Sequence, residues 1–371
     1  MALVALQLPP ELNGARSSAG LVTLMGTLAF LFPVAIWYRY SQRLASSGGL
    51  FSFVEAAVGR RLALVQAAFW IVSYFLYLVY TVPYIVYDLL PAVFPQVNQY
   101  RLALDAATAA LIAIVMLSPL IASLAVVAAI ATVQVLIAVL LLVVTFSSLG
   151  APAASFIGHG NLASILTAAG KTSSLYICAS LPLFLAGEVR GGSRTVQRAL
   201  AWTFPAVGAL AVIAVFPLAN ATQAVVGADI PGVALARAAN VPGLTALVGV
   251  GVALSVAGLI FAEFLALTRL VANIVTRPTR FVGIVSVVAF LAATAISLID
   301  PSRAYTVLLK PSLIALWISQ LLVVAVYPWF AAKGWGQSSH GSLRLGDIGL
   351  AVAASLLMLF ALYQSVTSGG T

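Results

Sequence analysis

Long apolar runs follow one another along almost the whole chain, separated by short polar connectors. A helix needs about 20 apolar residues to cross the hydrocarbon core of a bilayer. Ten segments approach or exceed this length: 19–39, 62–88, 102–122, 124–148, 173–189, 199–219, 244–270, 281–299, 306–331 and 345–366. The pattern therefore predicts an all-α polytopic membrane protein with about ten transmembrane helices, in which 149–172 and 220–243 are longer connectors.

Composition supports a membrane location and narrows the function. Of the 371 residues, 63% are hydrophobic and 7% are charged, whereas roughly 25% are charged in an ordinary soluble protein. This excludes a soluble enzyme, a disordered chain and a nucleic-acid-binding domain. The lipid bilayer is thus the first expected partner, and nucleic acid is not a partner.

The basic residues predict an orientation. Placing the end of the first span in the cytoplasm puts 12 of the 18 Lys and Arg residues on that side, which agrees with the excess of basic residues on cytoplasmic loops. The twelve are Arg39, Arg43, Arg60, Arg61, Arg190, Arg194, Arg198, Arg269, Arg277, Arg280, Lys333 and Arg344. Ten spans then leave both termini outside. We interpret this as the loss of a span before residue 19, by natural truncation or a misassigned start, with Met1–Leu8 as its tail.

Few side chains could hold a cofactor or a metal. Cys178 is the one cysteine, and the two histidines, His159 and His340, fall in connectors. Intramembrane histidines that could ligate a haem are therefore missing, as is a paired acidic motif for Mg²⁺ and pyrophosphate. We expect no cofactor, no metal site, no catalytic residues and no enzyme activity.

The span 173–189 contains a helix-breaking proline. Pro182 cannot donate a hydrogen bond to the preceding turn and clashes with it, so the helix should kink or open nearby. In transporters, broken helices expose backbone groups that hold substrate. The candidate substrate residues at this break are Tyr176, Ile177, Cys178, Ala179 and Ser180. A simple proline kink, common in membrane helices, is the alternative.

Tyrosines recur at helical spacing along the span 62–88. Tyr77 and Tyr80 are candidate walls of a polar cavity, because a tyrosine hydroxyl inside a membrane needs a polar neighbour. Packing against other helices explains these two and Tyr74 equally well. Tyr84 and Tyr87 are expected to belong to the outer aromatic belt.

Glu263 is the one carboxyl group deep inside a long apolar run. A charge at that depth is costly and points to function, here as a proton-coupling site. The alternatives are a structural ion pair with Arg269 or another basic group nearer the cytoplasm, and a protonated carboxyl bonded to a backbone carbonyl. Asp88, Asp105 and Asp300 lie at outer helix ends and are expected to be solvated caps.

Three motifs resemble the amino acid–polyamine–organocation (APC) superfamily. The stretch 46–54, SSGGLFSFV, followed by a glycine and a tryptophan at positions 59 and 70, is similar to the family's junction of helices two and three. The stretch 185–190, LAGEVR, with the basic residues after it, resembles the segment that follows helix six. The stretch 268–270, TRL, resembles the inner end of helix eight, and Pro231–Gly232 resembles the preceding outer loop.

The resemblance implies a LeuT-like fold with two inverted five-helix repeats in a single transporter domain, 1–371. Residues 1–172 would be the remnant of the first repeat, 173–331 the second repeat and 345–366 an additional helix. It implies a plasma-membrane permease for amino acids or related amines that works by alternating access, as a proton symporter or an exchanger. The alternative is a transport-inactive truncated paralogue, or a membrane subunit that needs a partner chain.

The chain also departs from the family pattern. The glycine motif of family helix one aligns with Ala2, Leu3 and Val4, where glycines are missing, and the inner half of that helix is absent. Gly191–Gly192 replaces an Asn-Pro pair after helix six, and the twelfth helix has no counterpart.

Overall fold

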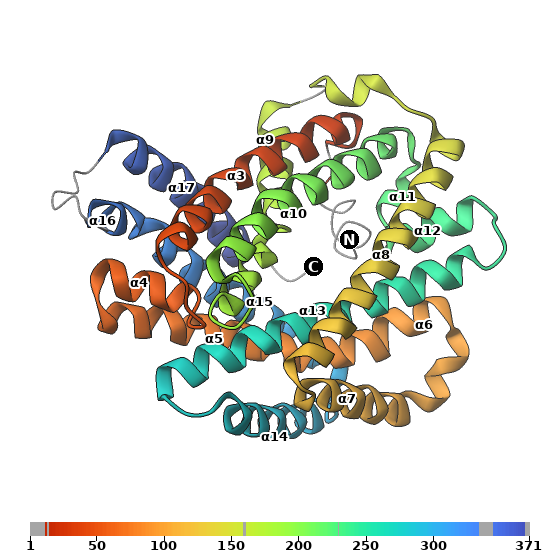
Figure 1. The fold of residues 1–371 in the computed structure, drawn as a ribbon. Coiled ribbons are helices and arrows are strands. Elements are labelled where there is room, and N and C mark those ends of the chain that lie inside the picture. The colour runs from red at the N-terminus through yellow and green to blue at the C-terminus, as the bar shows by residue number, and fades with distance from the viewer. Residues whose placement is uncertain (1–11, 13–14, 159–160, 229, 334–343, 368–371) are drawn as a thin grey trace.

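The computed structural model describes residues 12, 15–158, 161–228, 230–333 and 344–367, so the aligned positions Ala2, Leu3 and Val4 and the segment Met1–Leu8 lie outside the described residues. Within the described part there is no β-strand, and nine helical segments are long and apolar enough to cross a membrane. Their main helices are α3 (Ala19–Arg43), α5 (Arg60–Pro83), α7 (Arg101–Leu117), α8 (Leu120–Leu149), α10 (Gly192–Val215), α13 (Leu244–Val275), α14 (Thr279–Ser297), α15 (Pro301–Ala325) and α17 (Leu345–Thr367) (Figure 1). The predicted all-α polytopic fold is confirmed.

The predicted span 173–189, the one of the ten that is not among these nine segments, is not a continuous α-helix. A helix, α9 (Leu162–Ser174), begins inside the predicted connector 149–172, and after a turn the chain continues as a 3-10 helix, η5 (Ile177–Leu185). The predicted start at residue 173 is therefore wrong. The early start has a physical reason, since α9 buries Ile165, Ala168 and Ala169 and packs on α3. An amphipathic segment of this kind is stabilised by tertiary contact despite its modest length.

Two prolines set other boundaries differently from the sequence prediction. The break between α7 and α8 falls at Ser118–Pro119, where Ser118 is extended with ψ 155°. A residue before proline disfavours the helical region, so the predicted boundary at 122–124 is wrong. After Pro83, α5 continues through a π-helical turn, η2 (Tyr84–Leu89), and a short helix, α6 (Leu90–Val93). Pro83 has no main-chain N–H to donate, and its ring crowds the preceding turn, so the regular α-helical pattern is interrupted at this point.

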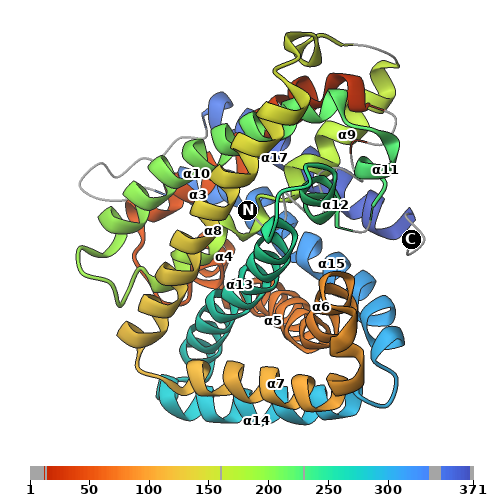
Figure 2. The same ribbon diagram turned by 90° about the vertical axis from the view of Figure 1, so that its right-hand side faces the viewer.

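The remaining elements are short and connect the spans. They are α4 (Leu50–Val58), α11 (Gln223–Val226), α12 (Pro231–Ala238), α16 (Tyr327–Ala332), and the 3-10 helices η1 (Arg16–Ser18), η3 (Pro95–Tyr100), η4 (Ala153–Phe156) and η6 (Phe216–Asn220). Figures 1 and 2 show α7 and α14 side by side at one edge, remote from α3 and α9. The helix α5 packs on α15 and α13, and α13 also packs on α8. The core of the molecule is therefore built around α5 and α13.

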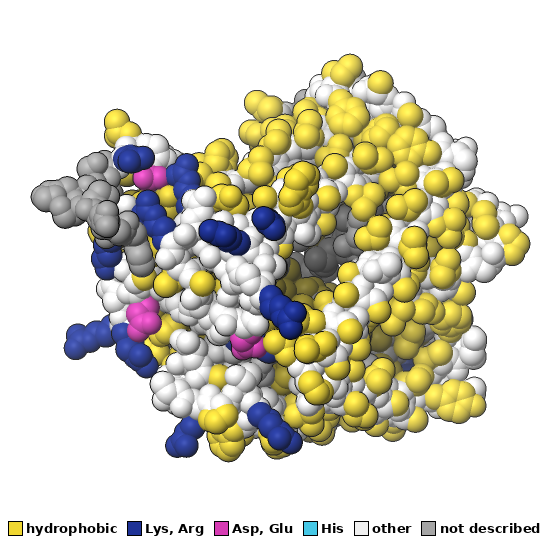
Figure 3. Space-filling view, in the orientation of Figure 1, with side chains coloured by type: hydrophobic (Ala, Val, Ile, Leu, Met, Phe, Trp, Pro, Cys, Tyr) yellow, Lys and Arg dark blue, Asp and Glu magenta, His cyan; other side chains and the backbone are white. Residues whose placement is uncertain are grey.

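Helix ends that the charge pattern puts on the same side of the membrane are joined in the structure. At the inner side, Arg39 Nη1 donates to Asp347 Oδ1 (2.6 Å) and Lys333 Nζ donates to the Ala56 carbonyl (2.6 Å). At the outer side, Lys310 Nζ donates to the Val366 carbonyl (2.8 Å). Figure 3 shows the Lys and Arg side chains gathered on the half of the visible face that carries α4, while the other half is mainly hydrophobic or uncharged.

The three outer acids differ in environment. Asp300 caps α15 by accepting a hydrogen bond from the Arg303 N–H (3.2 Å), and Asp88 is exposed. Asp105 is 1% exposed, and neither carboxyl oxygen has a hydrogen-bond partner in the described structure. The prediction of a solvated cap is wrong for Asp105, because α7 lies against α14 and α13 and Asp105 is on the buried face of the helix.

Candidate functional site

The turn between α9 and η5 is closed by local hydrogen bonds. The N–H groups of Leu175 and Tyr176 donate to the carbonyls of Thr172 and Ser173, both at 3.2 Å, and the Ala179 N–H donates to the Tyr176 carbonyl at 2.9 Å. These bonds span three residues instead of four, which is the 3-10 pattern. The α-helix thus ends before Pro182, and the break lies at 175–176, at the start of the predicted break at 176–180.

Tyr176 anchors this segment between two spans. Its hydroxyl lies 2.7 Å from Thr27 Oγ1 on α3. Thr27 gives its own hydroxyl hydrogen to the Thr23 carbonyl at 2.8 Å, so Tyr176 is the donor. The Tyr176 ring also contacts Phe30 and Phe204, with centroid distances of 5.9 and 5.2 Å. The segment is therefore held on one side by a hydrogen bond and on the others by aromatic packing.

A cavity of about 350 Å³, which we call the central cavity, lies against this segment. Its wall is formed by α5, α8, α10, α13 and the chain from Leu175 to Pro182. Four of the predicted substrate residues belong to the wall: Tyr77, Tyr176, Cys178 and Ala179. The volume falls within the range of about 300–1,000 Å³ typical of small-molecule sites. The structure thus brings residues from the two predicted features, the proline-interrupted span and the tyrosines of 62–88, to one cavity.

The other three predicted substrate residues lie behind this wall. Ile177 is 6% exposed, and Ser180 is fully buried, with its hydroxyl donating to the Ile177 carbonyl (3.2 Å). The Tyr80 ring packs edge-on against Tyr77 and Tyr305, at centroid distances of 5.3 and 5.5 Å. These three residues are buried and pack behind the residues that line the central cavity.

Glu263 is buried on α13 directly behind the cavity. Glu263 is 2% exposed. The Cys178 thiol donates a hydrogen bond to Glu263 Oε1 at 3.8 Å. The second oxygen, Oε2, has no hydrogen-bond partner in the described structure. The carboxyl therefore contacts the 3-10 segment through a weak donor, and no cation from the described residues forms an ion pair with it, although a buried charge normally has such a partner.

The alternative explanation for Glu263, an ion pair with Arg269, is wrong. Arg269 instead binds Glu188, which follows η5, through Nη2 at 2.9 Å and Nε at 3.1 Å. A carboxyl bonded to a backbone carbonyl finds no support either, because no such contact is made by Oε2. The described residues contain no group of three or more His, Cys, Asp or Glu side chains that could hold a metal ion.

Sequence reasoning missed most of the cavity wall. Gln134 and Ile130 of α8, Thr203 and Phe204 of α10, and Ser255 of α13 all line it. One signal was available, since Gln134 is an amide in the middle of a long apolar span and such a group needs a polar or internal location. The apolar wall residues carried no comparable signal.

Comparison with known proteins gives a fold and no family. No family model and no curated protein matches the sequence. A crystal structure of the manganese transporter of Eremococcus coleocola, in complex with an aromatic bis-isothiourea substituted compound, has a TM-score of 0.64 at 12% identity, over 98% of this chain and 85% of that chain. A histidine-to-alanine mutant of that transporter has a TM-score of 0.61 with the same identity and coverage. The chain thus shares the fold of a membrane transporter, with an arrangement of multiple membrane helices.

Proposed function

We propose that the protein is a secondary active transporter of amino acids or related amines that works by alternating access in the plasma membrane. The observation that carries this proposal is the central cavity, which lies between an interrupted helix and a buried carboxyl group whose Oε2 has no hydrogen-bond partner among the described residues. Interrupted helices supply backbone groups to substrates in transporters. The shared fold with transporter structures supports the same general function.

The chemistry of the cavity favours an amine over other solutes. Cys178 lines the cavity, and its thiol contacts the Glu263 carboxyl group, so this carboxyl group lies directly behind the cavity wall. A carboxyl without a cationic partner attracts an ammonium group or a proton, and either would offset the cost of its charge. Tyr77 adds a hydroxyl to a wall that is otherwise largely apolar. We therefore assign Glu263 to proton coupling and the wall residues to substrate contact.

The APC-like organisation belongs to the same proposal. In a single transporter domain with repeats at 1–172 and 173–331, the boundary between the repeats would fall near the end of α9. The second repeat would then begin with the interrupted segment that leads into η5, and 345–366 would be an additional helix. Coupling to protons and exchange of two substrates remain two modes of this mechanism. The manganese transporters of similar fold give a further substrate class to be tested beside the amines.

Uptake by the purified chain in proteoliposomes tests the function. Labelled amino acids, polyamines and Mn²⁺ are supplied separately, with and without an inward proton gradient. We expect saturable uptake of an amino acid or amine, which the proton gradient accelerates in the symport mode. Uptake of Mn²⁺ alone would refute the amine assignment while retaining transport, and the lack of any uptake would favour the transport-inactive subunit.

A matched pair of substitutions locates the site. Ala179→Phe places a ring in the central cavity, whereas Ala201→Phe places the same ring on the exposed face of α10. Substrate uptake should be lost in the first variant and kept in the second. Equal uptake by both variants would show that the central cavity is not the substrate site.

A further inference from the structure

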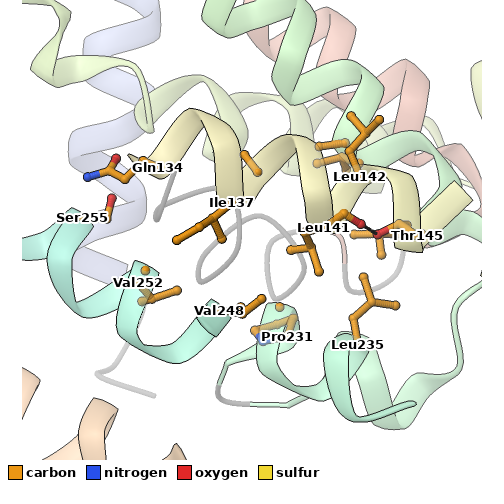
Figure 4. Close-up of a pocket in the computed structure, with 16 residues that line it drawn as sticks. Gln134, Ile137, Leu141, Leu142, Thr145, Pro231, Leu235, Val248, Val252 and Ser255 are labelled. Carbon is orange, nitrogen blue, oxygen red and sulfur yellow. Dashed lines mark hydrogen bonds between the residues drawn. The ribbon is translucent and has the colours of Figure 1, made fainter. Parts of the chain in front are cut away.

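A second, smaller cavity adjoins the central cavity. It encloses about 80 Å³ between α8, α13, α12 and the junction of α10 with η6. Figure 4 shows Gln134 and Ser255 at one end of this space, with Thr145 and Leu142 toward the other end. Both Gln134 and Ser255 also line the central cavity, so these two side chains form the boundary between the two spaces.

The two cavities lie end to end along the contact of α8 with α13. On α8, the central cavity is lined within 127–134 and the second cavity within 134–145. On α13, the corresponding ranges are 255–262 and 248–255. Residue numbers increase toward the second cavity on α8 and decrease toward it on α13, because the two helices are antiparallel. On both helices, the residue shared by the two cavities, Gln134 or Ser255, lies between them.

The second cavity lies on the outer side of this boundary. It reaches the C-terminal part of α8 and the residues Pro231 and Leu235 of α12, within the 220–243 connector. The distribution of Lys and Arg puts that connector outside the membrane. The pair Gln134–Ser255 therefore lies between the central cavity and the space that reaches the outer connector.

The helices approach closely around the boundary because α13 presents small residues there. A Cβ atom added at Gly251 would lie 2.5 Å from Ile137 Cδ1, and one added at Gly258 would lie 2.8 Å from Ile130 Cγ2. The Gln134 Nε2 atom is 3.6 Å from the same added atom at Gly258. Small residues of this kind allow membrane helices to pack in close contact, and here they leave room for the Gln134 amide.

Gln134 is the polar group that a solute would meet at this point. The second cavity is lined mainly by apolar side chains, and Thr145 directs its hydroxyl to the Leu141 carbonyl of its own helix at 2.6 Å. An amide offers both donors and an acceptor. It can therefore close the passage by contacts with α13 and also bind a polar solute during passage.

We propose that Gln134 and Ser255 form a gate between the central cavity and the outer side, which opens when α8 moves relative to α13. This proposal rests on the proposed transport function, since it assigns the route by which substrate reaches the cavity. It predicts that the cavity is shielded from the outside when the gate is intact.

Cys178 is a native reporter for this gate. It is the one cysteine of the chain and it lines the central cavity on the inner side of the boundary. A membrane-impermeant methanethiosulfonate reagent is added to intact cells that express the full chain, and the labelled fraction is followed with time after purification. In the unaltered protein we expect slow labelling. Gln134→Ala removes the amide and most of the side-chain bulk at the boundary, and should label about tenfold faster, a ratio that corresponds to about 1.4 kcal/mol.

Two controls make the result specific. Thr132→Ala alters the same helix at an exposed position that lines neither cavity and should label as slowly as the unaltered protein. Cys178→Ala gives the background, and labelling in denaturing detergent confirms one reactive thiol in each of the other proteins. Fast labelling of the unaltered protein, or equal rates for Gln134→Ala and Thr132→Ala, would overturn the gate.

The labelling measurement does not depend on transport. Faster labelling of Gln134→Ala in a protein that takes up none of the tested solutes would support the gate and count against the assigned substrate. Measurable uptake combined with unchanged labelling would support the transport function and refute the gate.

Discussion

Two acidic side chains at α13 have opposite environments: Glu188 contacts this helix from another segment, and Glu263 belongs to it. At the inner end of the helix, Glu188 binds Arg269 through two hydrogen bonds, and the side chains are 29% and 5% exposed, respectively. Six residues earlier along the helix, Glu263 faces a thiol and has an unpartnered oxygen. The inner contact is a complete ion pair, whereas the cavity contact is incomplete.

The difference indicates what each region does. A buried charge is tolerated in a structural role when a partner of opposite charge and hydrogen bonds compensate it, and Arg269 meets both conditions. A polar group left incomplete beside a cavity is a functional hypothesis, because only a proton or a bound solute would complete it. We therefore interpret the inner pair as a clamp between α13 and the chain after η5, and Glu263 as part of the working site.

Removing the charge of the inner pair should give the largest loss of stability. Glu188→Gln leaves the nearly buried Arg269 guanidinium without a counter-charge, although the amide oxygen can still accept a hydrogen bond. Breaking such a pair costs about 3 kcal/mol or more. We expect the free energy of unfolding, measured by titration with a denaturing detergent, to fall by about that amount.

An exposed ion pair provides the matched control. Arg60 and Glu55 lie 3.6 Å apart, with side chains that are 57% and 36% exposed. Glu55→Gln should lower the free energy of unfolding by less than about 1 kcal/mol, as exposed pairs contribute little. Equal losses for Glu188→Gln and Glu55→Gln would contradict the interpretation of the inner pair as a clamp.

The anchor of the interrupted helix should have an intermediate effect. Tyr176→Phe removes the hydrogen bond to Thr27 Oγ1 but keeps the ring between Phe30 and Phe204. The loss of one hydrogen bond costs about 1 kcal/mol, and the same unfolding titration measures it. Tyr100→Phe, in a residue that is 60% exposed, should change the free energy of unfolding by far less.

The sequence predicted the membrane helices and the unusual position of Glu263 better than it predicted which side chains pair with each other. The apolar runs predicted the membrane helices, the proline predicted an interrupted helix, and the isolation of Glu263 marked it as unusual. One of the alternatives for Glu263, an ion pair with Arg269, is not formed. Arg269 lies less than two turns from Glu263 on the same helix, so proximity along the chain favoured that pair, whereas Glu188 arrives from another segment through tertiary packing.

The cavity wall could not be predicted for a related reason. Apart from Gln134, the middle of α8 is apolar on most sides, so its sequence contains no continuous polar stripe that distinguishes the face toward the cavity from the face toward lipid. The burial of Asp105 likewise depends on how α14 and α13 cover α7. In a membrane protein, polarity along the chain reveals depth in the bilayer, while the direction in which an apolar helix faces depends on its neighbours.

Glu263→Gln should have the smallest effect on stability and the most specific effect on transport. The amide has nearly the shape of the carboxyl group, and its oxygen can keep the contact with Cys178 Sγ. No ion pair is lost, so the free energy of unfolding should change by less than about 1 kcal/mol. If Glu263 carries the coupled proton, the variant should no longer respond to an inward proton gradient in the proteoliposome assay, although exchange of substrate across the membrane should persist, because exchange requires no net proton movement. A loss of stability as large as that of Glu188→Gln would instead mean that Glu263 is a structural charge, and the contrast between the two ends of α13 would then disappear.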